Sequence, residues 1–365
     1  MESLTLQDVD SRFENCYVNR RQRSITDRCS HELASVSSSK EHDPSSSSTH
    51  WSSENPQSPT EILVSAVGGS GNAEEENEKD MLTRTSCLSY GSISLIGRRR
   101  VMNDAVVVTT VDSYQFFAVY DGHGGSSVSN ACRDRLHHLL AQEVEPWIRG
   151  GEGVVDWEKV MASCFTKMDE EVGGSVVGAD TEGNRVNTVG SSAVVVIVGQ
   201  NEVVVANSGN SRAVLCRGGV AIPLSRDHNP DRPDERERVE AAGGRVINCN
   251  GCRVLGVLAT SRSIGDHYLK PYVISEPEVT ISERTEYCDF LVIASDGIWD
   301  VVSNEHACQV VRRCLDADKK RRSSEGMSGS NAAADAAALL AQLALARGSK
   351  DNITVIVIEL NKSAS

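Results

Sequence analysis

The pattern of apolar and polar positions divides the chain near residue 85. Residues 35–49 are rich in serine, residues 73–80 are acidic, and apolar side chains before residue 84 are sparse and show no sustained period. A segment of this kind cannot bury enough apolar surface to offset its conformational entropy. We therefore predict a mostly disordered extension over residues 1–85 and a folded domain over residues 86–362.

The predicted domain contains many apolar runs of strand length. In its first part they cover residues 88–95, 105–111 and 116–120, and in its middle residues 192–198, 202–208, 212–217 and 220–224. Two further runs lie near the C-terminus, at residues 290–294 and 353–358. The short glycine- and asparagine-containing turns between the middle runs are typical of an antiparallel meander.

Apolar residues at helical spacing predict helices between and after these strands. The helices cover residues 126–147, 157–171, 235–242, 301–315 and 332–346, and residues 172–187 form a loop. Pro146 is expected to end the first helix because proline has no N–H group, and Pro233 fits the first turn of the third. This arrangement predicts an α+β fold in layers, with the strand order left open.

Three aspartates stand at the ends of apolar runs that are far apart in the sequence. Asp121 and Asp296 each follow a run and precede a glycine, and Asp351 comes just before the last run. An ordinary Asp-Gly turn explains Asp121 equally well when it is taken alone. Three carboxylates brought together would need cations to neutralise them, so the set predicts a metal site. Gly122 lacks a Cβ atom, so its backbone can come close to a hard cation such as Mg²⁺ or Mn²⁺.

Composition narrows the range of functions. The 365 residues carry a formal net charge of −14, which argues against a nucleic-acid-binding surface and gives no support for attraction to anionic lipids. The N-terminus lacks the apolar core of a secretory signal, and no apolar run approaches the length that spans a bilayer. We therefore expect neither nucleic acid nor a membrane among the partners.

The eleven cysteines are scattered without a framework spacing, and we expect them to be reduced intracellular thiols. Cys249 and Cys252 form a lone C-x-x-C pair. A zinc site would need a second ligand pair, and a redox pair would need a thioredoxin-like setting; the sequence offers neither. We interpret Cys249 and Cys252 as loop thiols without a special role.

Five motifs contain most of the residues named so far. They are YDGHGG at residues 120–125, GNSRA at 209–213, ATSRSIGD at 259–266, ASDGIWD at 294–300 and KDNI at 350–353. One Asp-Gly-His motif is weak, but the five in this order closely resemble those of the metal-dependent type 2C protein serine/threonine phosphatases. The resemblance covers residues 90–360, and residues 227–235 and 266–271 resemble the plant branch that includes abscisic-acid co-receptors.

The resemblance implies a central β-sandwich of two antiparallel sheets flanked by helices, with a two-metal centre at one end. Asp121 would bridge two ions of Mg²⁺ or Mn²⁺, and the backbone carbonyl of Gly122 would bind one of them. Asp296 and Asp351 would hold the other. A water activated between the ions would attack phosphorus directly, so no phosphoenzyme is required.

Two further residues receive roles from the same resemblance. Arg99 would grip the substrate phosphate, and His123 would stand where the family has a candidate general acid for the leaving serine or threonine oxygen. From the residues alone, Arg99 also fits a solvated turn, although an arginine offers a fork matched to phosphate oxygens. His123 also fits a turn residue that hydrogen-bonds its neighbours.

Three positions depart from the family's pattern. Asn103 stands where the family has a glutamate that supports the second ion, and Asn210 where it has an aspartate linked to an additional, weaker site. Both changes remove negative charge, so we expect weaker metal binding. Co-receptors contact the hormone-bound receptor through a tryptophan from the loop that here covers residues 247–251. Cys249 replaces that tryptophan, so we expect poor inhibition by such receptors.

We interpret the chain as a protein serine/threonine phosphatase, a phosphoric monoester hydrolase of plant signalling with phosphorylated proteins as substrates. The main alternative is a catalytically impaired module that binds kinases or phosphoproteins, which Asn103 and Asn210 favour. A hydrolase of small phosphates has less support, because nothing indicates a closed pocket. We expect a monomer in the cytoplasm, the nucleus or both; the basic run at residues 319–322 fits nuclear import or a solvated loop.

Overall fold

The computed structural model describes residues 63–65, 88–149, 154–176, 189–249, 251–325 and 331–360. All of them belong to one unit of the chain, residues 58–365. Of the predicted extension only strand β1 (Leu63–Ser65) is described, and it pairs with β2 (Tyr90–Leu95). The rest of residues 1–85 lies outside the described residues, so its disorder stays a prediction.

The first sheet joins strands from both ends of the domain in the order β1-β2-β14-β13-β7-β8. Its later members are β7 (Arg212–Arg217), β8 (Val220–Pro223), β13 (Cys288–Ala294) and β14 (Ile353–Glu359). Strands β13 and β14 are antiparallel, with Ala294 opposite Val355. The end of β13 therefore lies beside the start of β14.

The second sheet has the order β12-β6-β5-β4-β3, with β11 (Ile264–Gly265) also pairing with β5. Its members are β3 (Ala105–Val111), β4 (Tyr114–His123), β5 (Gly190–Val198), β6 (Glu202–Ser208) and β12 (Glu278–Glu283). All its pairings are antiparallel. The meander predicted for the middle of the chain is divided between the two sheets, because β5 and β6 belong to the second and β7 and β8 to the first.

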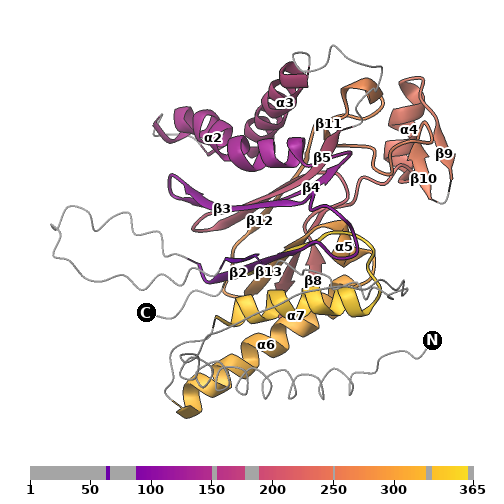
Figure 1. Ribbon diagram of the computed structural model, residues 1–365. Helices are drawn as coiled ribbons and strands as arrows, with labels where there is room; N and C mark the ends of the chain where they lie inside the picture. The colour runs from indigo at the N-terminus through magenta and orange to yellow at the C-terminus, as the bar shows by residue number, and fades with distance from the viewer. Residues whose placement is uncertain are drawn as a thin grey trace, which may run out of the picture. The chain divides into compact units, whose positions relative to one another are not determined.

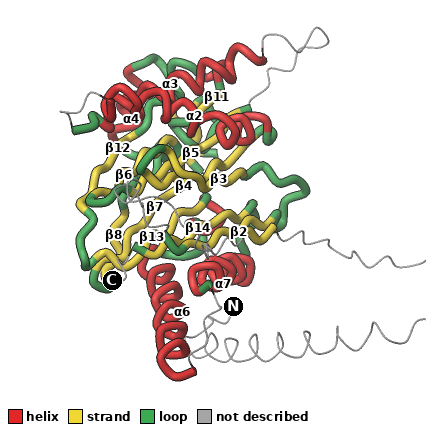
Figure 2. Tube along the Cα trace, turned by 90° about the vertical axis from the view of Figure 1, so that its left-hand side faces the viewer, coloured by secondary structure: helices red, strands yellow, loops and turns green. Residues whose placement is uncertain are grey.

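Four layers result, with helices on both outer faces of the two sheets (Figures 1 and 2). Helices α2 (Ser127–Arg149) and α3 (Trp157–Val176) cover the second sheet, and α6 (Asn304–Glu325) and α7 (Ala332–Ala346) cover the first. One apolar core lies between the sheets and includes Phe117 and Ile356. Another lies between the second sheet and its helices and includes Phe116 and Phe165. This is the predicted α+β sandwich, and its rigid strands position the side chains at their ends.

Several predicted boundaries were wrong. Strand β4 continues to His123 instead of ending at Tyr120, because Asp121 and Gly122 still pair with β5. Helix α2 continues past Pro146 to Arg149, and Trp147 in its last turn packs against the second sheet's core. Helix α3 extends to residue 176, so the predicted loop begins later, and most of it lies outside the described residues.

Helix α6 also differs from its prediction. It begins at Asn304 and continues to Glu325, beyond the predicted end at residue 315. The basic run at residues 319–322 is therefore helical and not a loop. By contrast, the structure gives β6, β7 and α7 the bounds predicted from the sequence.

A small flap stands beside the sandwich and consists of α4 (Pro233–Ala241), β9 (Val246–Asn248) and β10 (Cys252–Val254). An ion-pair network anchors it. Glu235, whose side chain is 2% exposed, accepts hydrogen bonds from Arg238 and Arg262 and one of 2.5 Å from Ser261. Burial alone would raise the pKa of Glu235, but these hydrogen bonds lower it well below 4.5. We call Glu235, Arg238 and Arg262 the flap network.

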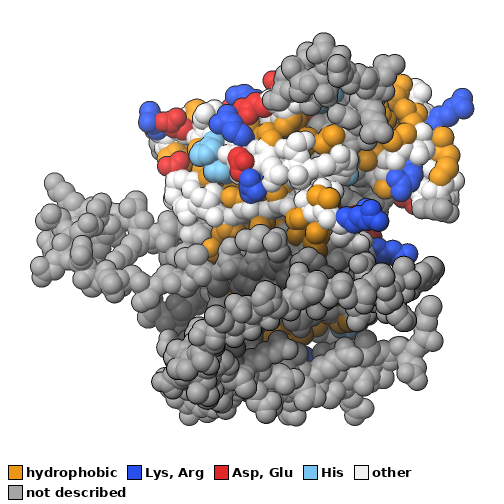
Figure 3. Space-filling model, in the orientation of Figure 1, with side chains coloured by type: hydrophobic (Ala, Val, Ile, Leu, Met, Phe, Trp, Pro, Cys, Tyr) orange, Lys and Arg blue, Asp and Glu red, His pale blue; other side chains and the backbone are white. Residues whose placement is uncertain are grey.

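On the part of the described surface that Figure 3 leaves uncovered, charged side chains of both signs are visible, and they do not gather into one basic area. Among the described residues, no helix is both long enough and apolar enough to cross a membrane.

Candidate active site

The two sheets bring acidic side chains from distant parts of the chain to one end of the sandwich. Asp121 comes from β4 of the second sheet, whereas Asp296 follows β13 and Asp351 precedes β14 in the first. Asp296, Asp104 and Asp351 all act electrostatically on the carboxyl group of Asp121, in that order of strength. We call Asp104, Asp121 and Asp296 the acidic cluster.

The carboxyl groups of this cluster have raised pKa values, because burial and one another's charge disfavour their ionised forms. Burial and then the charge of Asp296 raise the pKa of Asp121 well above its ordinary 3.8. Burial raises the pKa of Asp104 to about 6 against hydrogen bonds from Thr354 and Ser295. Burial and the neighbouring aspartates raise the pKa of Asp296 to about 7. Carboxylates in such surroundings gain most from a cation supplied from outside the chain.

The hydrogen bonds of the cluster leave one oxygen without a donor. Ser295 donates to Asp104 over 2.9 Å, and the side-chain amide of Asn210 donates to Oδ2 of Asp296 over 2.8 Å. Asp121 and Asp296 can share a hydrogen bond only when one of them carries a proton. With both ionised, Oδ1 of Asp296 is buried and no donor among the described residues faces it. An all-oxygen set with such an oxygen fits a hard divalent cation.

Asp351 is paired with Arg99. The guanidinium group donates to both carboxylate oxygens, with Nε to Oδ1 at 2.8 Å and Nη2 to Oδ2 at 2.5 Å. Among the described residues, no three His, Cys, Asp or Glu side chains are arranged so that they could hold a metal ion. The predicted ligands Asp121, Asp296 and Asp351 are therefore electrostatic neighbours without forming a finished coordination shell.

The backbone around Gly122 is closely packed. A Cβ atom at this position would lie 2.5 Å from the carbonyl oxygen of Asn103 and 2.8 Å from the hydroxyl of Ser129, so only glycine fits. Asn103 is held through its backbone, where its N–H donates to Asn352 and its carbonyl accepts from Ser129. Asn103 thus stands next to the buried Asp104 at the start of β3, close to the backbone of Gly122.

The ring of His123 is fixed by a buried aspartate. Nε2 lies 2.6 Å from Oδ2 of Asp266, which also accepts a 2.6 Å hydrogen bond from Ser263. A carboxylate can only accept, so Nε2 carries the hydrogen and Nδ1 is the ring nitrogen left for other contacts. A Cβ atom at Gly190 would lie 2.1 Å from Oδ2 of Asp266, so glycine is required there. His123 is accordingly a well-oriented side chain.

Arg212 belongs to the GNSRA motif, and its side chain reaches helix α6. It forms a bidentate ion pair with Asp227, donates to Asn304 over 2.8 Å, and its guanidinium carbon lies 5.2 Å from the centre of the Trp299 ring. Arg212, Asp227 and Asn304 line a surface pocket of about 450 Å³. Arg212 and Asp227 also act electrostatically on Asp300, which belongs to the ASDGIWD motif.

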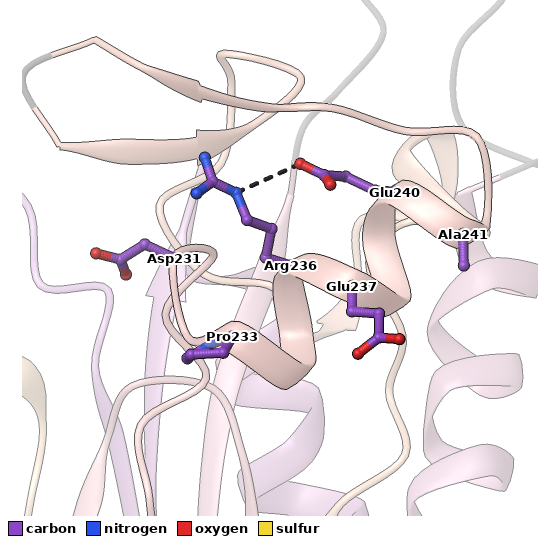
Figure 4. Close-up of a pocket in the computed structure, with 6 residues that line it drawn as sticks. All are labelled: Asp231, Pro233, Arg236, Glu237, Glu240 and Ala241. Atoms are coloured by element: carbon purple, nitrogen blue, oxygen red, sulfur yellow. Dashed lines mark ion pairs between the residues drawn. The ribbon is translucent and has the colours of Figure 1, made fainter.

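A second surface pocket, of about 460 Å³, lies along α4 and contains none of the predicted site residues. Its lining includes Glu237 and an ion pair of 3.3 Å between Arg236 and Glu240 (Figure 4). All of these side chains are exposed on the outer face of the helix. The pocket therefore carries no chemistry of its own.

Sequence reasoning missed Asp104 and Asp266 as parts of the site. Each had a local signal: Asp104 directly precedes a valine-rich strand, and Asp266 follows a glycine in one of the five motifs. The partner of each lies far away in the sequence. Asp104 pairs with Ser295 and Asp266 with His123, separations of 191 and 143 residues.

The layered sandwich, with acidic side chains contributed by both sheets, is the arrangement of a type 2C phosphatase. Solved structures support the fold. A sex-determining protein of C. elegans aligns with a TM-score of 0.65 over 76% of this chain and 65% of its own, at 23% identity. A serine-threonine phosphatase 2C from Toxoplasma gondii aligns with a TM-score of 0.61 over 74% of this chain and 94% of its own, at 22% identity.

This chain belongs to the protein phosphatase 2C family, whose model matches residues 88–353. "Probable protein phosphatase 2C 8" of Oryza sativa subsp. japonica is 54% identical over 77% of this chain and 76% of its own. "Probable protein phosphatase 2C 24" of Arabidopsis thaliana is 46% identical over 86% of this chain and 90% of its own. The predicted family, fold and phosphatase activity are confirmed.

Proposed function

We propose that this phosphatase hydrolyses phosphoserine and phosphothreonine in other proteins with two divalent cations, Mg²⁺ or Mn²⁺, at the acidic cluster. One observation carries the proposal: the cluster holds carboxyl groups with raised pKa values, and Oδ1 of Asp296 has no donor among the described residues. Oxygen donors of this kind suit hard cations. Asp121, Asp296, Asp351 and the carbonyl of Gly122 would hold them.

When bound, such cations lower the pKa of a water molecule and neutralise charge on the phosphoryl oxygens. The chain's own residues would do the rest. Arg99 lies at the edge of the cluster through its ion pair with Asp351, and its planar fork matches phosphate oxygens. Asp266 orients His123 through Nε2, and when the ring also carries a hydrogen on Nδ1, that nitrogen would give its proton to the leaving serine or threonine oxygen.

Hydrolysis of a phosphopeptide with added Mn²⁺ or Mg²⁺ tests the proposal, with Asp296→Ala as the matched control. We expect phosphate release by the natural protein that stops when the cation is chelated, and almost none from the variant. Release that is unaffected by chelation, or equal in the two proteins, would contradict it.

Asn103 should lower the affinity of the site for one of the two cations. It stands beside Asp104 and offers an amide oxygen where a carboxylate would add charge. We expect Asn103→Glu to reach half-maximal activity at a lower Mn²⁺ concentration, by about 10-fold or more, because ligand charge is a main determinant of metal affinity. Identical Mn²⁺ titrations of the two proteins would refute this role.

A binding module without catalysis is the second candidate, and one contact favours it. The amide of Asn210 donates to Oδ2 of Asp296 and so occupies a lone pair that a cation would use. Such a module would bind phosphorylated proteins or kinases tightly without releasing phosphate. The phosphopeptide assay separates the two candidates, because binding by calorimetry with no turnover above Asp296→Ala would support the module.

We also propose a role in plant signalling, because the named relatives come from rice and Arabidopsis. An abscisic-acid receptor should inhibit this protein poorly. Cys249 is exposed at the turn between β9 and β10, where a small side chain cannot act as a large aromatic anchor. Purified protein with hormone and receptor should keep most of its activity, and Cys249→Trp should lose more of it. Strong hormone-dependent inhibition of the natural protein would refute this expectation.

A further inference from the structure

Two buried cysteines meet between β7 and α6, away from the acidic cluster. Cys216 is 0% exposed and Cys308 is 3% exposed. Cys308 lies one turn before Arg312 on α6, and Arg312 contacts the sulfur of Cys216, so the two thiols are neighbours. Both are free, like the other described cysteines. The proposed phosphatase reaction uses neither of them, so the pair has no role yet.

An arginine places positive charge on one of the two sulfurs. Nη2 of Arg312 lies 3.1 Å from Sγ of Cys216 and 2.5 Å from a carboxylate oxygen of Asp289. The side chains of Arg312 and Asp289 are 38% and 28% exposed, so the guanidinium group reaches from solvent to the sulfur. Gly219 makes room for it, because a Cβ atom there would lie 3.0 Å from Nη1 of Arg312.

This environment separates Cys216 from other buried thiols of the chain. Burial raises the pKa of Cys164 and of Cys314 to about 12, as expected for an inert core thiol. The neighbouring thiol of Cys308, and then Arg312, outweigh burial at Cys216 and lower its pKa to about 7. The pKa of Cys308 is raised instead, because a thiolate at Cys216 favours the protonated form of its neighbour. Cys216 is thus the nucleophile of the pair, and Cys308 is a nearby thiol that stays protonated.

We infer that Cys216 and Cys308 form a redox site that a hydroperoxide converts to a disulfide. The thiolate of Cys216 attacks one peroxide oxygen, the O–O bond breaks, and the departing hydroxide takes a proton to become water. The sulfur is now a sulfenic acid. The sulfur of Cys308 then attacks it, the S–O bond breaks, and a second water leaves with the proton of Cys308. Two thiols and one hydrogen peroxide give one disulfide and two waters.

Because both sulfurs are buried, only a small oxidant can react with them, and the disulfide would link two packed elements of the fold. Neither sulfur is accessible to a bulky disulfide such as oxidised glutathione. A small oxidant such as hydrogen peroxide would enter where the partly exposed Arg312 reaches Cys216, when that side chain moves aside. The new bond would join β7 to α6 a short distance beyond Arg212 and Asn304, the residues at which these elements begin. Those two residues are already hydrogen-bonded at the edge of the active site.

The test uses the full-length protein and hydrogen peroxide. Free thiols are alkylated after oxidation, and peptides are analysed by mass spectrometry without reduction. We expect a joined peptide that contains Cys216 and Cys308, is lighter by two hydrogens than the separate thiol peptides, and disappears on reduction. The double variant Cys249→Ser/Cys252→Ser is the matched control, because it removes the two cysteines of the flap and should leave this linkage intact.

Two single variants separate the steps. Cys308→Ser should stop at the sulfenic acid of Cys216, which dimedone traps. Arg312→Met should slow the oxidation of Cys216 about tenfold, as a change of one unit in its pKa would. The inference is overturned if peroxide that oxidises Cys249 leaves Cys216 and Cys308 reduced, or if Arg312→Met, folded by circular dichroism, is oxidised at the natural rate.

Discussion

The acidic cluster and the flap network solve the same problem, the burial of carboxylates, in opposite ways. In the flap network, Glu235 is surrounded by Arg238, Arg262 and Ser261, and its pKa is lowered. In the acidic cluster, Asp121 and Asp296 are surrounded by other carboxyl groups, and their pKa values are raised. One set is neutralised by cations of the chain, while the proposed function assigns cations from outside the chain to the other.

The comparison separates stability from function. A carboxylate that the chain itself compensates contributes to the folded state, and its loss leaves the arginines around it without that negative charge. An uncompensated buried carboxylate costs stability, and the proposed function gives it a role in binding cations. The same type of substitution should therefore have opposite effects on stability in the two regions.

The largest effect is expected from Asp121→Asn. If Asp121 binds the cations directly, as proposed, its loss should reduce phosphopeptide hydrolysis at least about 100-fold, since even the residues behind the ligands of metal sites contribute 10- to 100-fold. The variant should nevertheless unfold at a higher temperature than the natural protein when divalent cations are chelated, because a buried uncompensated charge is gone. Activity and thermal unfolding are measured on the same preparation. A lowered melting temperature in chelator would contradict the comparison.

Glu235→Gln should do the reverse and destabilise the fold. Breaking a buried ion pair by removing one partner costs about 3–5 kcal/mol, and here two arginines lose their carboxylate. Denaturant unfolding in chelator measures the change. Glu237→Gln on the same helix is the control, because its side chain is exposed and should change stability little. Equal unfolding curves for the two variants would show that the flap network is not what anchors α4.

Arg99→Met tests whether a cation of the chain competes with a metal ion for the same carboxylate. Arg99 is paired with Asp351, which is a predicted metal ligand. The ion pair is 56% and 30% exposed, so it contributes up to about 1 kcal/mol, which corresponds to about fivefold in binding. We expect Mn²⁺ to bind the variant up to about fivefold more tightly by calorimetry, while phosphopeptide turnover falls. Arg98→Met should change neither. Weaker Mn²⁺ binding to Arg99→Met would mean that Arg99 and the cation do not compete.

The smallest effect concerns Glu278, which joins the flap to the second sheet. His228, whose Nε2 lies 3.4 Å from a carboxylate oxygen of Glu278, and then the hydrogen bonds from Arg232 lower the pKa of Glu278 from 4.5 to about 2. The folded state thus favours the ionised form, so its contribution to stability is present above pH 4.5 and is lost as the pH falls towards 2. Glu278→Gln should be less stable than the natural protein at pH 6, and the difference should shrink on acidification. A difference that grows with falling pH would refute the assignment.

Local signals predicted much of the fold. Strand β7 and helix α7 have the predicted bounds, because a glycine or asparagine turn or a capping residue marks their ends. Helix α2 passes Pro146 because Trp147 packs against the core, and this tertiary contact outweighs the lost backbone hydrogen bond. Strand β4 likewise extends to His123 through its pairing with β5.

The sequence predicted which residues belong to the candidate site, but not which of them contact one another. Motifs identified Asp121, Asp296 and Asp351, because a carboxylate at a strand end has a local signature. The partners of Arg99 and of His123 had none. Arg99 meets Asp351 across 252 residues, and such contacts depend on the strand order of a sheet, which apolar periodicity does not contain.

The acidic cluster draws its members from both halves of the sandwich, with Asp121 in one sheet and Asp296 at the end of the other. An ion held by both would fasten the halves together, and any ligand of the folded chain alone shifts the unfolding equilibrium, by about 2.7 kcal/mol at a hundred times its dissociation constant. The lifetime of the protein in a cell would then follow the supply of that ion. Starvation for manganese or magnesium would deplete the enzyme as well as silence it.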